Sequence, residues 1–338
     1  MKTTVKIILL FLLLILPACQ SSSPQDLLTR TPSLTSTLTV IATTTHTDTA
    51  TVTDTSTPTA ISTPAPRARR VLILSIDGLR PDVISLAPMP NLLSFMQSSA
   101  YSLSAQTVLP SVTLVSHSSM LTSYCPSDHG VYWNDYIPEF GYAIGTDLFD
   151  IAHAAGLWTE MIAGKAKLQQ VTEPASLDNF VFINDRDAVI ADYIVENFPE
   201  QFGVLFVHFP LVDGMGHRHG WLSPEQLSVA FRADEAFGKI LAELDARNLR
   251  GETLIIISAD HGGHNTSHGS SRPEDMTIPW IASGPGIKPG PLTTTVHTMD
   301  TAATAAFALG LEYPADWDGV PVYEAFGLPV ERTSIQCE

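Results

Sequence analysis

Short apolar runs alternate with helical stretches along this chain, and this alternation strongly limits the folds it can adopt. The mostly apolar runs predict strands at residues 71–76, 158–163, 203–209, 253–258 and 277–282. Helices are expected between them, at residues 91–98, 147–155, 187–197, 223–244 and 300–309. Short unbroken apolar strands are typical of parallel sheets that are buried on both faces. The pattern therefore predicts an α/β fold with a mainly parallel central sheet flanked by helices on both faces.

The first 66 residues are not expected to belong to this fold. Residues 1–19 combine Lys2 and Lys6 with an apolar run and end in Leu-Pro-Ala-Cys. This layout predicts a secretory signal and resembles a bacterial lipobox, which would place a lipid on Cys19. An ordinary signal peptide or an uncleaved anchor, with an accidental cysteine, is the alternative. In every version the rest of the chain leaves the cytoplasm and lies on the cell surface or in the periplasm.

Residues 20–66 consist mainly of Ser, Thr, Pro and Ala, so they cannot bury enough apolar surface to offset their ordering entropy. They predict a disordered tether between the anchor and one folded domain at residues 67–338. The formal net charge of the chain is 18 − 35 = −17. This charge argues against a nucleic-acid surface or an anionic membrane surface as the main partner. Contact with the membrane is expected through the lipid anchor, and a small-molecule substrate is expected at the site that the motifs below indicate.

Acids and histidines follow three of the predicted strands. Asp77 comes directly after the first strand, Asp213 comes four residues after the strand ending at 209, and Asp260 and His261 follow the strand ending at 258. His217 and His268 lie in the segments that follow. Because ligands in parallel sheets bind beyond the carboxyl ends of the strands, these side chains are expected to share one crevice.

Carboxylates that converge in this way repel one another unless cations compensate for their charge. The sequence is expected to provide few nearby Lys or Arg residues, so bound divalent metal is the natural neutraliser. Mixed imidazole and carboxylate ligands favour zinc, ahead of manganese or iron, and suit calcium poorly.

A hydroxyl-rich segment, residues 109–122, is expected to be a loop that turns into a helix near Thr113. A hydroxyl at a helix N-terminus lies in positive potential, which favours its alkoxide form. Thr113 could equally be a simple helix cap. The spacing alone does not choose among the competing hydroxyl groups, which are those of Thr113, Ser111, Ser116 and Ser118.

Six motifs appear in an order that resembles the type I phosphodiesterase and nucleotide pyrophosphatase branch of the alkaline phosphatase superfamily. They are Asp77-Gly, Pro-x-x-Thr113-x-x-x-His117, Cys-Pro-Ser-Asp-His129-Gly, Asp213-x-x-Gly-His217, Asp260-His261-Gly-Gly and His268-Gly. The resemblance covers roughly residues 71–310. It implies an alkaline phosphatase-like domain with two divalent metal ions, zinc being the first choice.

The resemblance also implies individual roles. Asp213, His217 and His268 would hold one metal ion, and Asp77, Asp260, His261 and the oxygen of Thr113 would hold the other. Thr113 would be the nucleophile that forms a phospho-threonine intermediate, and Asn134 would donate to a phosphoryl oxygen. Without the resemblance, Asn134 could equally be an ordinary turn residue. Four other histidines match no ligand role of the family, namely His117, His129, His219 and His264.

The length of one segment departs from the family pattern. Only six residues separate His261 from His268, where family members with nucleotide activity usually carry a long insertion, so a small, reduced cap is expected. Asn134 and the absence of an arginine clamp near Thr113 favour a phosphodiesterase. A phosphomonoesterase or a phosphonate hydrolase remains an alternative on the same seven ligands.

The sequence lacks features that three other functions require or predict. A sulfatase needs a Cys/Ser-x-Pro-x-Arg signature, which the Cys125-Pro-Ser-Asp segment lacks. A phosphoethanolamine transferase normally brings several membrane spans. A non-catalytic surface-binding lipoprotein predicts losses among the ligands, and none is missing. If Cys19 is lipidated, Cys125 and Cys337 remain either as a disulfide pair in an oxidising compartment or as two free thiols.

Overall fold

The computed structural model describes residues 67–337, and these residues build an eight-stranded sheet in the order β4-β3-β5-β1-β6-β7-β2-β8. The lipobox with Cys19 and the predicted tether lie outside the described residues. The central strand, β1 (Arg70–Ile76), pairs in parallel with β5 (Phe202–Phe209) on one side and with β6 (Thr253–Ser258) on the other. The core of the fold is centred on these three strands, which are almost fully buried along their length.

The remaining strands extend the sheet to both edges. They are β2 (Ala100–Gln106), β3 (Trp158–Ala163), β4 (Asn179–Phe182), β7 (Thr277–Ser283) and β8 (Gly290–Pro291). β3 and β4 continue the parallel pairing, whereas β7 runs antiparallel to both β6 and β2. The prediction of a mainly parallel sheet is therefore confirmed.

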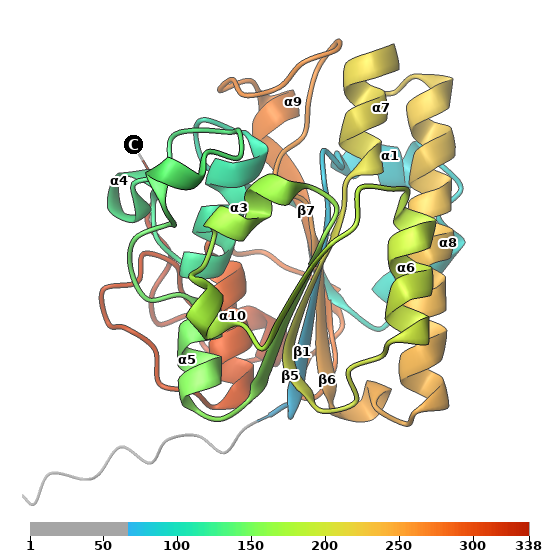
Figure 1. Ribbon diagram of the computed structural model, residues 1–338. Coiled ribbons are helices and arrows are strands. Elements are labelled where there is room, and N and C mark those ends of the chain that lie inside the picture. The colour runs from blue at the N-terminus through green and yellow to red at the C-terminus, as the bar shows by residue number, and fades with distance from the viewer. Residues whose placement is uncertain (1–66, 338) are drawn as a thin grey trace, which may run out of the picture. The chain divides into compact units, whose positions relative to one another are not determined.

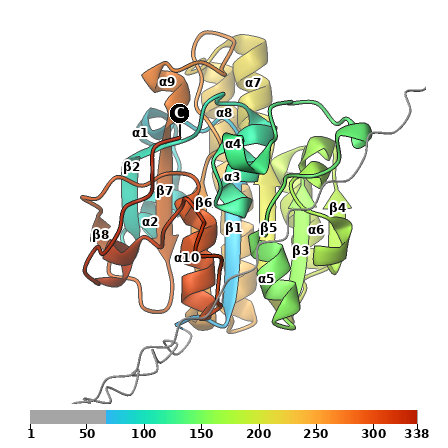
Figure 2. The ribbon, with the colours of Figure 1, turned by 90° about the vertical axis from the view of Figure 1, so that its left-hand side faces the viewer.

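Helices cover both faces of the sheet (Figures 1 and 2). One layer contains α1 (Pro81–Leu86), α2 (Pro90–Met96), α6 (Asp187–Glu196), α7 (Leu211–His219) and α8 (Pro224–Ala246). The opposite layer contains α3 (Thr113–Thr122), α5 (Leu148–Ala154) and α10 (Asp300–Leu309). The short helices α4 (Pro126–His129) and α9 (Pro273–Met276) lie beyond the sheet, near the edge at which β1, β5 and β6 end (Figure 1).

The longest helix begins as the sequence predicts. The side chain of Ser223 accepts a hydrogen bond from the backbone amide of Gln226, and Pro224 occupies the first turn. Both features stabilise a helix N-terminus, since they satisfy or remove free backbone donors. The structure also contains elements that were not predicted, namely α1, α4, α7, α9, β2, β4 and β8.

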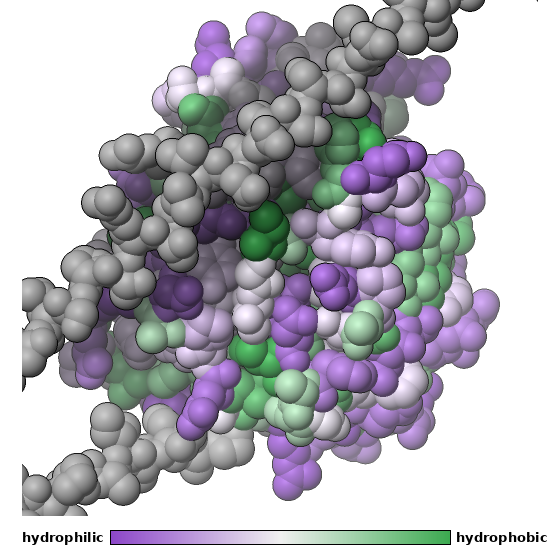
Figure 3. Space-filling view, turned by 60° about the vertical axis from the view of Figure 1, so that its left-hand side comes forward, coloured by the Kyte–Doolittle hydropathy of each residue, from purple (hydrophilic) through white to green (hydrophobic). Residues whose placement is uncertain are grey.

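The two ends of the described chain are held differently. Residue 67 leads directly into β1, whereas the C-terminal segment crosses the α3 side of the sheet and ends in a disulfide between Cys337 and Cys125. Within residues 67–337 no helix is both long and apolar enough to cross a membrane. Figure 3 shows hydrophobic and hydrophilic side chains interspersed on one face of this part of the chain.

Candidate active site

Three carboxylates meet at the carboxyl edge of the sheet. Asp77 follows β1, Asp260 follows β6, and Asp213 lies in the first turn of α7, directly after β5. Gly78 makes this approach possible: its φ of +73° turns the chain after β1, and a Cβ atom there would lie 3.0 Å from the Cα atom of Asp213. All three acids are at least 97% buried, so their charges are poorly screened by solvent.

The three predicted histidine ligands each present Nε2 to these carboxylates. The Nδ1 atoms of His261, His268 and His217 are 2.8, 2.9 and 3.0 Å from the backbone carbonyl oxygens of Gly262, Ser111 and Thr266. A carbonyl oxygen only accepts, so each Nδ1 carries the hydrogen of the neutral ring, and each Nε2 keeps a free lone pair. Hydrogen bonding of one ring nitrogen to a carbonyl group is typical of metal-binding histidine.

Lone pairs and carboxylate oxygens therefore face one another at short range. The Nε2 atom of His261 is 3.2 Å from Oδ2 of Asp260 and 3.5 Å from Oδ1 of Asp77. Around Asp213, Oδ1 is 3.3 Å from Nε2 of His217 and 3.5 Å from Nε2 of His268. Two groups of atoms that accept but do not donate repel at this distance unless a cation lies between them.

Three of the carboxylate oxygens are buried without a hydrogen-bond partner, namely Oδ1 of Asp77, Oδ1 of Asp213 and Oδ2 of Asp260. Leaving such atoms unpaired costs about 1–3 kcal/mol each, and more for charged groups. They belong to two clusters whose ligand atoms lie within 4.8 Å of one another: Asp77, Asp260 and His261, and Asp213, His261 and His268. The residues present thus fit two divalent cations, and His261 lies within reach of both clusters.

Thr113 lies at the start of α3, in front of these clusters. Val112, not Thr113, occupies the cap position of the helix, so the alternative in which Thr113 is a simple cap does not apply. The Oγ1 atom of Thr113 is 3.5 Å from Nε2 of His261. By contrast, the hydroxyl of Ser111 donates to the carbonyl of Ser270, and that of Ser118 donates to the carbonyl of Leu114. Of these three hydroxyl groups, only that of Thr113 contacts the histidine and carboxylate cluster.

Asn134 lies beside the nucleophile candidate. Its Oδ1 atom accepts a hydrogen bond of 2.9 Å from the backbone amide of Leu114, the residue after Thr113. This contact leaves the Nδ2 group available to a ligand, since Asn134 is partly exposed. The role that the family resemblance implies for Asn134, donation to a phosphoryl oxygen, stays a prediction.

Lys165 is a residue of the site that the sequence analysis missed. Its ammonium lies 2.7 Å from Oδ2 of Asp77, 2.6 Å from Oδ2 of Asp213 and 3.2 Å from Oγ1 of Thr113. The few cations that the sequence offers near the acids thus include one that contacts two of them directly. A signal was present, because Lys165 follows β3 by two residues and so reaches the same edge of the sheet as the acids.

Two buried histidines contact residues of the site from the interior of the protein. In β5, His208 donates from Nε2 to Oδ2 of Asp77 at 2.9 Å, and its Nδ1 accepts from the backbone amide of Gly164. In α3, His117 contacts the carbonyl oxygen of Thr113 at 2.7 Å. His208 was not predicted from the sequence as a site residue. A signal was present, because a histidine inside an otherwise apolar strand is unusual.

The burial of these groups changes their protonation. Burial lowers the pKa of His261, and burial together with His261 lowers the pKa of His268 to about 4. Both rings are therefore neutral near pH 7, as metal binding requires. Burial would raise the pKa of Asp77, but Lys165 and His208 outweigh it and hold that pKa well below its usual value. Burial and the charge of Asp77 raise the pKa of Asp260, which shows how poorly this site accommodates a third negative charge.

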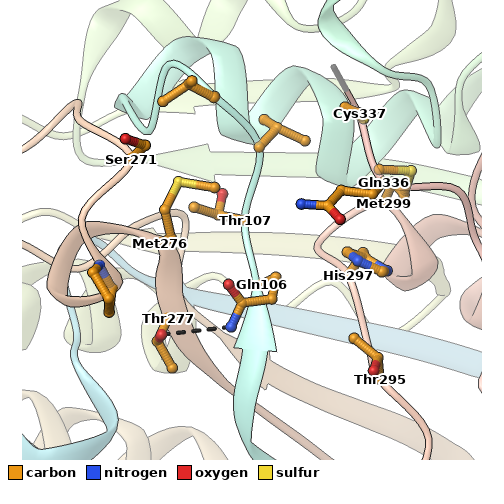
Figure 4. A pocket seen from close by; sticks show the side chains of 13 residues that line it. Gln106, Thr107, Ser271, Met276, Thr277, Thr295, His297, Met299, Gln336 and Cys337 are labelled. Atoms are coloured by element: carbon orange, nitrogen blue, oxygen red, sulfur yellow. Dashed lines mark hydrogen bonds between the residues drawn. The ribbon is translucent and has the colours of Figure 1, made fainter.

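A separate cavity of about 480 Å³ lies next to the site but contains none of its predicted residues (Figure 4). The end of β2, the start of β7 and the C-terminal segment line it, and Cys337 and Gln336 lie at one side. Thr107 links the two regions, because its hydroxyl donates to the carbonyl oxygen of Asp260. This cavity is therefore not the candidate active site.

Known proteins are similar to this chain in fold and, more distantly, in sequence. A solved structure of murine ectonucleotide pyrophosphatase/phosphodiesterase 5, an inactive form in complex with AMP, superposes with a TM-score of 0.64 at 15% identity and covers 77% of this chain and 99% of that one. Human ectonucleotide pyrophosphatase/phosphodiesterase family member 5 is 25% identical over 218 residues. An uncharacterized pyrophosphatase/phosphodiesterase of Schizosaccharomyces pombe is 23% identical over 223 residues.

The matches to the human and the Schizosaccharomyces pombe proteins each cover 58% of this chain. The chain spans less than half of the length of these relatives, 45% in each case. The family description "Type I phosphodiesterase / nucleotide pyrophosphatase" matches residues 71–176 and 163–278, which is more than half of the chain. These matches include every predicted metal ligand, the threonine and Asn134. The chain therefore belongs to the type I phosphodiesterase / nucleotide pyrophosphatase family.

Proposed function

We propose that this chain is a metal-dependent phosphoric ester hydrolase in which Thr113 attacks phosphorus. One observation carries the proposal: the hydroxyl of Thr113 faces two clusters of acids and histidines. In these clusters, unpartnered carboxylate oxygens face Nε2 atoms that can only accept a hydrogen bond. Lys165 and His208 compensate for part of this negative charge, but the unpartnered oxygens of Asp77, Asp213 and Asp260 remain destabilising until further cations bind.

In this proposal Asp213, His217 and His268 hold one divalent ion, and Asp77, Asp260, His261 and the Thr113 oxygen hold the other. Zinc suits these ligands best. When bound, the two ions supply positive charge to the nucleophile, to the phosphoryl group and to the leaving oxygen. His208 and the carbonyl groups behind His217, His261 and His268 keep the ligands in their binding orientation.

The chain's own residues then account for two displacements. The Thr113 oxygen loses its proton to solvent and forms a bond to phosphorus, while the bond from phosphorus to the leaving alcohol or phosphate breaks. Asn134 donates from Nδ2 to a nonbridging oxygen and holds the phosphoryl group in line. Water then displaces Thr113 from the phospho-threonine, which restores the hydroxyl and releases the product.

We infer that phosphodiester or pyrophosphate bonds of nucleotides are among the substrates. Two of the matched relatives are named for these activities, and one structure holds AMP. We also propose, from the lipobox alone, that a lipid on Cys19 anchors the chain outside the cytoplasm. Replacement of Cys19 by Ala should then release the chain from the membrane fraction, and unchanged membrane association would contradict the anchor.

The central test replaces Thr113 by Ala and compares it with Ser111→Ala, which changes a neighbouring hydroxyl that is bonded to the Ser270 carbonyl. Hydrolysis of bis-p-nitrophenyl phosphate and metal content are measured on the same samples. Thr113→Ala should lose at least about three orders of magnitude in rate and retain its metal, whereas Ser111→Ala should remain active. A Thr113→Ala variant that hydrolyses the diester at the wild-type rate would refute the assignment.

A further inference from the structure

Lys165 is a cation for which the proposed two-metal chemistry has no role. Its ammonium lies between two metal-ligand carboxylates and 3.2 Å from the oxygen of the nucleophile. Its side chain is 21% exposed, whereas Asp77 and Asp213 are 0% and 4% exposed. Of these three side chains, Lys165 is therefore the one that solvent reaches.

Lys165 and the proposed metal ions use different atoms of the same carboxylates. The lysine contacts Oδ2 of Asp77 and Oδ2 of Asp213. The unpartnered oxygens of these two residues are the Oδ1 atoms, and these face the Nε2 atoms of the histidines. A lysine that merely stood in for a metal ion would occupy those oxygens instead. Lys165 is thus placed to remain beside the two ions as a third cation.

A count of charges indicates which phosphoryl group suits this site. Asp77, Asp213 and Asp260 contribute −3 and the deprotonated Thr113 oxygen contributes −1, whereas two divalent ions contribute +4 and Lys165 contributes +1, which gives +1. Without Lys165 the sum is 0. A phosphodiester carries one negative charge, whereas a phosphomonoester carries close to two at neutral pH, since its second pKa is about 6. The additional positive charge of Lys165 therefore favours the more negatively charged terminal phosphoryl group over a diester.

The position of the ammonium agrees with this count. A phosphorus atom attacked by Thr113 has to lie next to Oγ1, so its nonbridging oxygens come within hydrogen-bond reach of a group 3.2 Å from Oγ1. Asn134 approaches from the neighbouring loop, through its contact with the amide of Leu114. The two side chains can therefore bind different oxygens of one phosphoryl group.

We propose that Lys165 binds a nonbridging oxygen of the transferred phosphoryl group and gives this site a phosphomonoesterase activity in addition to its diester activity. The inference rests on the proposed function, because it needs the same nucleophile and metal ions. Thr113 forms the bond to phosphorus, the ester alcohol leaves with a proton from solvent, and water releases inorganic phosphate.

The test compares Lys165→Met with Lys239→Met, which removes an exposed lysine paired with Asp192 on the surface. For each protein, kcat/KM is measured with p-nitrophenyl phosphate and with bis-p-nitrophenyl phosphate. The dissociation constant of inorganic phosphate and the zinc content are determined on the same preparations. Lys165→Met should lower monoester kcat/KM at least tenfold more than diester kcat/KM, and weaken phosphate binding by about 10- to 100-fold at unchanged zinc content. Lys239→Met should match the wild type.

Three results would overturn the inference. They are an equal fall for both substrates, no fall for either substrate, and a changed zinc content that accounts for the loss. A zinc content that rises in Lys165→Met would show instead that the lysine competes with the metal. Thr113→Ala separates this inference from the proposed function. If Thr113→Ala is inactive while Lys165→Met affects both substrates equally, only the proposed role of Lys165 is refuted. If Thr113→Ala retains wild-type activity, the proposed function is refuted as well.

Discussion

The backbone amide of Leu114 donates to Oδ1 of Asn134 at 2.9 Å, and this bond joins the start of α3 to the loop that follows α4. The amide belongs to the residue after Thr113, so the bond also fixes Asn134 relative to the proposed nucleophile. The two ends of the Asn134 amide are therefore expected to have different uses, with Oδ1 holding the protein and Nδ2 holding the phosphoryl group.

Replacement of Asn134 by Asp separates these two uses. A carboxylate still accepts from Leu114, so the fold should be kept, but it cannot donate and it repels a phosphoryl oxygen. We expect kcat/KM for bis-p-nitrophenyl phosphate to fall about 100-fold or more for Asn134→Asp, with a smaller loss for Asn134→Ala. Exposed Asn184→Asp serves as the control for added charge. Full activity of Asn134→Asp would show that Asn134 acts only as a turn residue.

Metal binding should stabilise this chain as well as activate it. Lys165 compensates for only part of the repulsion among Asp77, Asp213 and Asp260, and bound divalent ions should relieve the rest. The chelated protein should therefore melt several degrees lower than the zinc-loaded protein. His217→Ala should lower the bound zinc from two equivalents towards one. His219→Ala, on the same helix and exposed, should retain both equivalents. Equal zinc content in the two variants would remove His217 from the ligand set.

Much of this site follows from the sequence because strand ends are easy to locate. The apolar runs before Asp77 and Asp260 are unambiguous, so both residues could be placed at one edge of a sheet. Lys165 follows a strand in the same way, but lysine is common on protein surfaces and its burial between carboxylates depends on the fold. The choice of Thr113 over its neighbouring serines came from the family resemblance, since a loop-to-helix turn offers several hydroxyl groups.

The elements missed from sequence have identifiable causes. Gly214 and Gly216 are poor helix formers, yet α7 contains both because its first turn continues directly from β5 and packs on α8. Strand β2 mixes serine with apolar residues, and its pairing with β7 contains a register shift, so its pattern is irregular. In both cases tertiary contacts decide the structure, and local sequence preference does not.

Buried Asp187 should make stability depend on pH. Its Oδ2 atom has no partner and its Oδ1 atom accepts only from the amide of Leu211, so burial raises its pKa to about 7. A carboxyl whose pKa is raised on folding favours the folded state when protonated. This contribution is complete below about pH 4 and is lost as pH rises through about 7.

Asp187→Asn replaces the neutral acid by a neutral amide of similar shape. Relative to the wild type, its free energy of unfolding should increase between pH 5 and pH 8 by on the order of a few kcal/mol. Urea denaturation in the presence of a chelator measures this difference. Exposed Asp185→Asn should show no such trend. A difference between Asp187→Asn and the wild type that does not change with pH would contradict a raised pKa for Asp187.

Gln170 connects the loop that carries Asn134 to the segment that carries Lys165. Its side chain is 1% exposed; Nε2 donates to the carbonyl oxygens of Ile137 and Gly141, and Oε1 accepts from the amide of Ile137. Lys165 precedes the 3₁₀ helix Ala166–Gln170, so this one glutamine fixes both proposed phosphoryl-binding side chains relative to each other.

Gln170→Leu should therefore affect stability and catalysis together. Leaving the loop carbonyls without a donor should lower the free energy of unfolding by about 2–4 kcal/mol. Displacement of Asn134 should lower kcat/KM roughly tenfold even at temperatures where the variant is fully folded. Gln169→Leu is the matched control, because this neighbour makes only a 3.5 Å contact with Tyr136. A Gln170→Leu variant that is destabilised but fully active when folded would show that the loop does not need this link to position Asn134.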